Sequence, residues 1–149
     1  MIHKLAKNEC LPMSLLLLAD PSEKLVREYT NRGDCFVYEI DGEIIGIIVL
    51  ISTRPKTVEI VNLAIKENFQ NHGYGKQLIH YAIQSAKDAG YHTMEIGTGS
   101  IGTKQLMLYQ RCGFRMVSID RDFFVRHYET PIIIDGMQLR DMVRLSQDL

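Results

Sequence analysis

The residues best suited to chemistry are grouped in segment 70–76, Gln-Asn-His-Gly-Tyr-Gly-Lys. Glycine at 73 and 75 removes two β-carbons from a short turn, so several main-chain N–H groups can point the same way. The turn precedes a segment with helical periodicity, and the positive end of a helix dipole favours anions. The pattern predicts an anion site, and a diphosphate fits it well because its oxygens accept several main-chain hydrogen bonds.

A strand and a helix are predicted on either side of this turn. Residues 57–65 are rich in β-branched and aliphatic side chains, which is typical of a buried strand. From Leu78 to Ala86 the apolar residues recur at helical spacing, and Gly90 is suited to a left-handed cap at the helix end. The predicted anion site therefore lies in a short loop between a strand and a helix.

Two common phosphate motifs do not fit the segment. A P-loop needs glycine at position 70 and Ser or Thr after Lys76, where the chain has Gln70 and Gln77. A dinucleotide fingerprint needs a third glycine at position 78, which is Leu78. Neither an NTPase nor a dinucleotide-binding enzyme is indicated.

The segment resembles the acetyl-CoA motif of the GNAT N-acetyltransferase superfamily, Arg/Gln-x-x-Gly-x-Gly/Ala, with Gln70, Gly73 and Gly75 at its fixed positions. Residues 59–65 resemble the central strand of that family, and residues 108–114 resemble its later Leu-Tyr-x-x-x-Gly-Phe signature. The resemblance covers residues 34–119 well. It implies transfer of an acetyl group from acetyl-CoA to a primary amine of a small molecule or protein, by direct attack in a ternary complex. The alternatives are a plain turn before a core helix and, for function, a non-catalytic acyl-CoA sensor.

The resemblance suggests two catalytic residues. A free amine is mostly protonated at neutral pH, so a base must accept a proton before the nitrogen attacks. Glu59, expected on the same strand face as Val61 and Leu63, is the candidate base; the alternative is a solvent-facing glutamate with water as the base. Tyr109 is the candidate acid for the departing sulfur, and its alternative role is a core aromatic packed beside Leu106.

The resemblance also implies which residues bind the cosubstrate. The main-chain N–H of Leu63 would meet charge on the thioester oxygen, and Ile65, next to Ala64, would pair with the pantetheine amides. The diphosphate would be held by the loop residues Gln70, Asn71, His72, Gly73, Tyr74, Gly75 and Lys76. For the side chains of His72 and Lys76 the alternatives are roles without ligand binding: His72 as a loop residue and Lys76 as a solvated lysine. Many relatives carry asparagine seven residues before the tyrosine, where this chain has Gly102, so Ser100 or Thr103 would have to substitute.

Composition narrows the class of protein. A chain of 149 residues fits one domain spanning residues 1–149. With 17 basic and 18 acidic residues it has a net charge of -1, which does not favour nucleic acid as a partner. Cys10, Cys35 and Cys112 form no Cys-x-x-Cys pair, so we expect no metal site and no disulfide framework, but reduced thiols in the cytoplasm. The apolar run 11–19 is too short to span a membrane and is expected to form a helix.

The expected fold is α/β of the α+β type: one mixed, mostly antiparallel sheet of six to seven strands with helices on both faces and a splayed central parallel pair. Strands are predicted at 2–5, 35–40, 43–52, 57–65, 92–98, 114–119 and 137–145. Helices are predicted at 11–18, 21–29 and 74–89, and around Leu106 and Tyr109. Asp41-Gly42 predicts a hairpin turn, residues 97–102 a loop, and Asp135-Gly136 the turn before the last strand.

Two further expectations concern the C-terminal third of the chain. The aromatic segment 120–131 either packs on the sheet or lines the acceptor pocket. The family resembled also suggests a homodimer formed through the C-terminal strands.

Overall fold

The computed structural model describes residues 1–149, and their contacts group them into two units. The first unit holds residues 1–94 with Leu149, and the second holds residues 95–148. No helix of the chain is long and apolar enough to cross a membrane.

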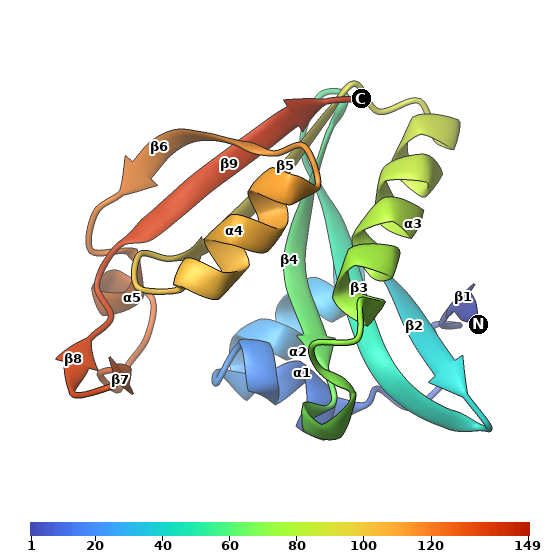
Figure 1. Cartoon of the computed structure of the whole chain (residues 1–149), viewed down its shortest axis with the longest axis horizontal. Helices are drawn as coiled ribbons and strands as arrows, with labels where there is room; N and C mark the ends of the chain where they lie inside the picture. The colour runs from blue at the N-terminus through green and yellow to red at the C-terminus, as the bar shows by residue number, and fades with distance from the viewer. The chain divides into compact units, whose positions relative to one another are not determined.

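The first unit contains an antiparallel sheet with the strand order β1 (Ile2–Lys4), β2 (Asp34–Ile40), β3 (Glu43–Arg54) and β4 (Thr57–Ile65) (Figure 1). The β2–β3 hairpin turns at Asp41 and Gly42, whose φ angles of 50° and 80° are those of the predicted two-residue turn. The predicted edge strand, hairpin and central strand are all present.

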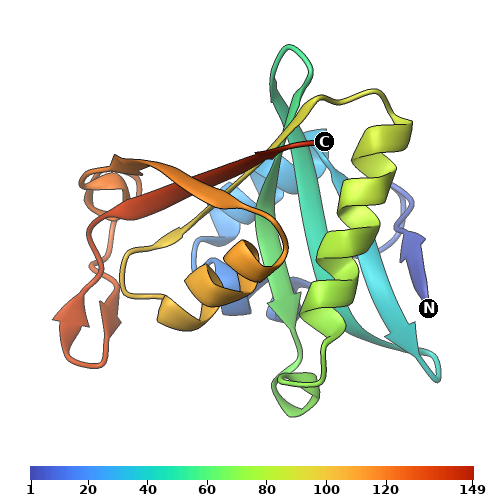
Figure 2. The ribbon, with the colours of Figure 1, turned by 45° about the horizontal axis from the view of Figure 1, so that its top comes forward.

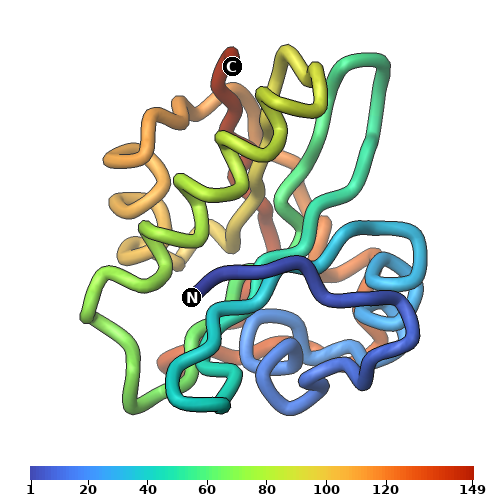
Figure 3. The backbone as a smooth tube through the Cα atoms, turned by 90° about the vertical axis from the view of Figure 1, so that its right-hand side faces the viewer, coloured from blue at the N-terminus to red at the C-terminus, as the bar shows by residue number.

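Helices cover both faces of this sheet (Figure 3). The helices α1 (Met13–Ala19) and α2 (Glu23–Arg32) pack on the face that carries Ile47, Val49 and Ile51. On the other face lies α3 (Tyr74–Asp88), near enough to Gly46 that a β-carbon there would come 3.1 Å from Leu78. A short 3-10 turn, η1 (Glu67–Phe69), joins β4 to the loop before α3.

Local signals in the sequence determine where these helices begin and end. The Ser22 hydroxyl accepts from the N–H of Leu25, as expected of an N-cap. Gly90 follows α3 with φ of 88°, which agrees with the predicted left-handed cap.

The second unit contains most of β5 (Thr93–Gly99) together with α4 (Thr103–Arg111), β6 (Arg115–Asp120), α5 (Phe123–Arg126) and β9 (Met142–Asp148). Its strands have the order β5-β9-β6, and β6 and β9 run antiparallel (Figure 2). The helix predicted around Tyr109 is present as α4, and Gly113 follows it with φ of 99°.

The predicted last strand, 137–145, is wrong in its bounds. Its first residues form β8 (Met137–Gln138), which pairs with β7 (Ile133–Ile134) in a separate hairpin that turns at Asp135 and Gly136. The strand that pairs with β6 is β9, which begins at Met142. A strong turn signal marks a hairpin, but it does not show which strands the hairpin connects.

The loop predicted at 97–102 begins later than expected, because Gly97, Thr98 and Gly99 belong to β5. The glycines instead allow close packing. A β-carbon on Gly97 would lie 2.5 Å from the sulfur of Met142, and one on Gly99 would lie 2.7 Å from Leu139.

Candidate active site

The loop between β4 and α3 has the backbone that its glycines predict. Asn71 and Gly73 have φ angles of 65° and 86°, so the chain passes twice through the left-handed region before the helix begins at Tyr74. A β-carbon on Gly73 would meet nothing within 4 Å, so this glycine is required by its backbone angle and not by crowding. The loop surface beside Gly73 is open for a ligand.

The first turn of α3 has main-chain donors suited to an anion. No side chain caps this helix, and its first turn carries no acidic residue that would compete for the N–H groups. The 15-residue helix adds the positive end of its dipole at the same place. These features fit the diphosphate of acetyl-CoA, a cosubstrate rather than a resident cofactor.

The side chains of Gln70 and His72 bind carbonyl oxygens and do not cap the first N–H groups of α3. Gln70 Nε2 donates to the carbonyl of Ile65 at 2.9 Å, and His72 Nδ1 lies 2.7 Å from the carbonyl of Gln70. Both side chains are exposed, as is that of Lys76. Gln70 and His72 therefore hold the loop in shape from the side of its carbonyl groups.

Aromatic rings support the loop on its inner side. The ring of Tyr74 lies edge-on to that of Tyr38, with centroids 4.9 Å apart, and 6.2 Å from that of Phe69. The hydroxyl of Tyr38 donates to Gln77 Oε1 at 2.8 Å, which connects β2 to the first turns of α3. Tyr38 and Phe69 were not predicted to belong to the site, because their role depends on contacts between distant segments.

Strand β4 carries a bulge that changes the predicted placement of Glu59. Val49 pairs with Asn62 and Leu50 pairs with Ile60, so Val61 is an extra residue without a partner on β3. Glu59 pairs with Ile51 and therefore lies on the face covered by α1 and α2.

The expectation that Glu59 shares a face with Leu63 is wrong. Leu63 pairs with Ile48, which alternates with Val49 and belongs to the opposite face. Beyond the bulge, Asn62 and Ala64 return to the face of Glu59, and Ile65 ends the strand. A bulge reverses the alternation of side chains, and nothing in the sequence marks this one.

Tyr109 lies on α4, in the second unit. Its side chain is only 7 % exposed, and its ring centroid is 6.4 Å from that of Phe114. Burial, with a smaller contribution from Cys112, raises the pKa of Tyr109 to about 12. The phenol therefore stays protonated at neutral pH, as a proton donor must.

The loop before α4 departs from the family pattern at Gly102. A β-carbon there would lie 3.0 Å from Gln105 Oε1 and 3.1 Å from Thr98 Oγ1, so a larger residue would crowd this turn. The N–H of Ser100 donates to the carbonyl of Asp141 at 2.9 Å, and Thr103 is exposed in the first turn of α4. That the side chain of Ser100 or Thr103 takes the place of the missing asparagine therefore stays a prediction.

Segment 120–131 is tied to the start of β9. The carboxylate of Asp120 contacts Arg126 at 2.7 Å and Arg144 at 3.1 Å, and hydrogen bonds from these arginines lower its pKa. The N–H of Phe124 donates to the carbonyl of Arg140 at 3.0 Å. These bonds fix the short helix α5.

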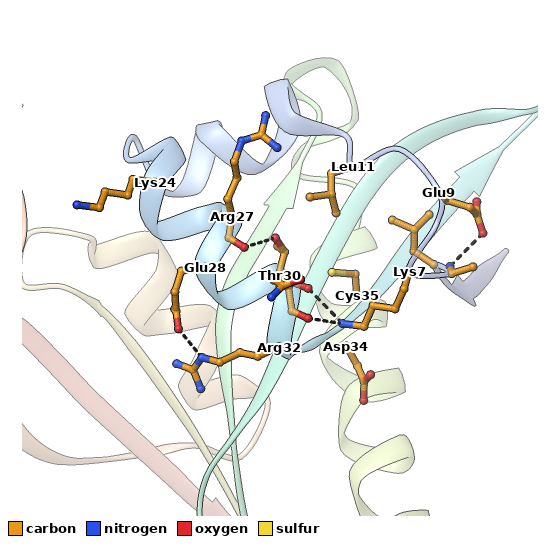
Figure 4. A pocket seen from close by; sticks show the side chains of 13 residues that line it. Lys7, Glu9, Leu11, Lys24, Arg27, Glu28, Thr30, Arg32, Asp34 and Cys35 are labelled. Atoms are coloured by element: carbon orange, nitrogen blue, oxygen red, sulfur yellow. Dashed lines mark hydrogen bonds and ion pairs between the residues drawn. The ribbon is translucent and has the colours of Figure 1, made fainter.

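A separate groove of about 650 Å³ lies between the N-terminal segment and α2 (Figure 4). Lys7 crosses it, and its Nζ donates to the carbonyls of Thr30, at 3.3 Å, of Asn31, at 3.1 Å, and of Gly33. The ammonium thereby binds the C-terminal carbonyls of α2. Burial raises the pKa of the Cys35 thiol that lines the groove, so this thiol is not activated as a nucleophile.

The sheet with helices on both faces and the uncapped glycine loop after β4 fit the acetyl-CoA-dependent transferases that the sequence resembles. The model of the Acetyltransferase (GNAT) family matches residues 7–114, more than two thirds of the chain. The chain belongs to this family.

Its relatives agree with this assignment. An uncharacterized N-acetyltransferase of Bacillus subtilis, YvbK, is 56 % identical over 135 residues, which cover 91 % of this chain and 87 % of that protein. A solved structure of an IAA acetyltransferase from Bacillus cereus has a TM-score of 0.95 at 48 % identity and covers 100 % of this chain and 99 % of that one. A GNAT family acetyltransferase from Elizabethkingia anophelis, solved with acetyl-CoA bound, has a TM-score of 0.97 at 41 % identity, with coverage of 100 % and 97 %.

These findings confirm three predictions. The chain is a GNAT protein, it is an acyltransferase, and it has the mixed, mostly antiparallel α/β fold of that family. The site residues stay predictions, because the comparisons report on the family and not on single side chains.

Proposed function

We propose that this protein acetylates a primary amine, of a small molecule or of a protein, by direct attack of the amine on acetyl-CoA in a ternary complex. The observation that carries the proposal is the loop at Gly73, where left-handed backbone leads into a helix whose first N–H groups have no side-chain cap. Acetyl-CoA bound to the Elizabethkingia anophelis relative supports the same ligand for this chain.

Binding is assigned to the segment from β4 through the loop. The N–H groups from Gly73 to Lys76 bind the diphosphate, and Lys76 adds positive charge beside them. Gln70, Asn71 and His72 shape the turn, and Tyr74 supports it from below. Leu63, Ala64 and Ile65 bind the pantetheine and acetyl end through their main-chain groups.

The reaction needs one base, one acid and one oxyanion donor. Glu59, directly or through a water molecule, accepts the proton of the amine, and the nitrogen forms its bond to the acetyl carbon. The N–H of Leu63 stabilises the negative charge on the acetyl oxygen. The carbon–sulfur bond then breaks, and the hydroxyl of Tyr109 gives a proton to the departing thiolate. The products are the N-acetyl amine and coenzyme A, with the proton balance restored through solvent.

The experiment that tests this function is a thiol-release assay with acetyl-CoA and a panel of acceptors. The panel contains spermidine, an aminoglycoside, free lysine and a short peptide with an unblocked N-terminus, together with IAA, which appears in the name of the Bacillus cereus relative. We expect thiol release that depends on one of the amines, with the N-acetyl product identified by mass spectrometry. Tight coenzyme A binding without turnover on a wide amine library would support the acyl-CoA sensor instead.

The organisation of the protein is part of the proposal. We propose one N-acetyltransferase domain over residues 1–149, which is supported by a family match that crosses from the first unit into the second. A homodimer is supported by the exposed apolar residues Met116, Val117 and Ile119 on β6, and light scattering would test it. A cytoplasmic location is supported by the buried Cys35 thiol, which forms no disulfide, and cell fractionation would test it.

A further inference from the structure

A buried chain of polar groups connects α1 and α2 to the bulge in β4. Asn62 Nδ2 donates to the hydroxyl of Tyr29 at 2.9 Å and to the carbonyl of Leu16 at 3.1 Å. The hydroxyl of Tyr29 then donates to Asp20 Oδ2 at 3.0 Å. Asn62, Tyr29 and Asp20 are only 4 %, 8 % and 7 % exposed, so these bonds lie within the core of the first unit.

Asp20 extends this chain to the junction between the two helices. Its Oδ1 accepts from the N–H of Ser22, the N-cap of α2, at 3.1 Å. Its own N–H donates to the carbonyl of Leu16 at 3.2 Å, the same carbonyl that Asn62 contacts. The end of α1, the start of α2 and one residue of β4 are therefore joined by three side-chain groups, one carbonyl and two main-chain N–H groups.

The position of Asn62 on β4 gives this chain a functional meaning. Asn62 immediately follows Val61, the bulged residue, and immediately precedes Leu63, whose N–H is the proposed oxyanion donor. It also shares its strand face with Glu59, the proposed base. A bond that fixes the side chain of Asn62 restrains the peptide groups on both sides of it.

Stability alone does not explain an asparagine at this position. Its Nδ2 has two acceptors, but its Oδ1 is buried and has no hydrogen-bond partner. An unpaired buried acceptor lowers stability, and an apolar residue would avoid that cost beside neighbours such as Val49, Ala64 and Leu16. A buried polar atom without a partner therefore calls for an explanation other than stability.

We propose that Asn62 and Tyr29 are positioning residues for acetyl transfer, which hold the bulged segment of β4 so that the N–H of Leu63 stays aimed at the acetyl oxygen. The proposal rests on the proposed function for the reaction itself. It also means that α1 and α2 are coupled, through Asn62, to the strand that carries the base.

The test compares Tyr29→Phe and Tyr29→Phe/Asn62→Leu with a matched control, Thr30→Val. Thr30 is 4 % exposed, and its Oγ1 donates to the carbonyl of Val26 at 2.7 Å. The control thus removes a buried hydroxyl from the same helix without touching the chain to β4. All three variants are measured at a temperature where each is folded.

Two measurements separate positioning from a structural role. With acetyl-CoA and the fastest amine of the panel, we expect Tyr29→Phe to lower kcat about tenfold while the KM for acetyl-CoA changes little, and Thr30→Val to leave both unchanged. In hydrogen exchange with saturating coenzyme A, the amides of residues 61–63 should exchange about tenfold faster in the Tyr29 variants only.

The double variant should unfold at no lower temperature than Tyr29→Phe, because Asn62→Leu removes the unpaired Oδ1, and its kcat should be at least as low as that of Tyr29→Phe. If its kcat equals that of Thr30→Val and amides 61–63 keep wild-type protection, the proposal is wrong. If wild-type protein acetylates no amine, the proposed function fails. The hydrogen-exchange measurement alone still decides whether the hydrogen bonds of Asn62 and Tyr29 hold the bulge of β4.

Discussion

The side chain of Gln70 ties the glycine loop to the end of β4, since its Nε2 donates to the carbonyl of Ile65 at 2.9 Å. Gln70, the first fixed residue of the acetyl-CoA motif, therefore makes a hydrogen bond within the protein. This bond joins the segment proposed to bind pantetheine to the loop proposed to bind diphosphate.

Replacing Gln70 with alanine should weaken coenzyme A binding about tenfold and change kcat less, because the loop loses an internal bond and must be ordered by the ligand. Isothermal titration calorimetry measures the affinity. Gln84→Ala is the matched control, since Gln84 makes an exposed bond to Asp88 near the other end of α3. Equal affinities for the two variants would contradict this role for Gln70.

Gly73→Ala should destabilise the protein by about 1 kcal/mol, because φ of 86° is unfavourable for any residue with a β-carbon, and should also weaken coenzyme A binding at least tenfold. Gly90→Ala provides the comparison, because Gly90 has φ of 88°, also has open space at its β-carbon, and lies beyond the far end of α3. Both variants should have a lower thermal midpoint than wild type, and only the variant at position 73 should lose affinity for coenzyme A. A loss of affinity in both would show that it reports stability alone.

Glu59→Gln should lower kcat at pH 7 by about 10²-fold if the carboxylate is the base, and the deficit should shrink as the pH approaches the amine pKa of ~10.4, where the amine is already neutral. A pH series of kcat for wild type and variant measures this. Glu28→Gln is the control, because it removes only an exposed ion pair with Arg32. A constant deficit at every pH would assign the proton transfer to water or another group.

Tyr109→Phe should lower kcat with coenzyme A affinity intact, because the phenol acts on the leaving sulfur and not on the diphosphate.

Tyr109 should also affect the pH dependence of stability. Its pKa is raised from 10.0 to about 12 in the folded state, so the unfolded chain loses the proton first and wild-type stability falls between pH 10 and pH 12. Urea midpoints at pH 8 and pH 11 should therefore drop more in wild type than in Tyr109→Phe. Equal drops would mean that Tyr109 titrates normally.

Features with a local signal could be predicted from the sequence. The left-handed cap at Gly90 and the Asp41-Gly42 hairpin each depend on a few neighbouring residues, so their spacing was sufficient. The bulge at Val61 depends on the pairing register with β3, and the alternation of side chains along β4 therefore misplaced Leu63 relative to Glu59.

The chain of Asp20, Tyr29 and Asn62 had only a weak signal, a polar residue within an apolar strand. Asn62 bonds to Tyr29 and to the carbonyl of Leu16, which lie 33 and 46 residues away in the sequence, and no local pattern identifies these partners. Asp135-Gly136 did form a turn. The strands that it joins, β7 and β8, form a hairpin that no alternation of apolar and polar residues predicted.

The central claim is that the main-chain N–H groups of residues 73–76 bind the diphosphate of acetyl-CoA. The most direct measurement is an NMR titration of ¹⁵N-labelled protein with coenzyme A and, separately, with pantetheine, which lacks the diphosphate. The account predicts large shifts of the amides of Gly73, Tyr74, Gly75 and Lys76 with coenzyme A and small ones with pantetheine. Unchanged amides at these four positions with saturating coenzyme A would contradict it.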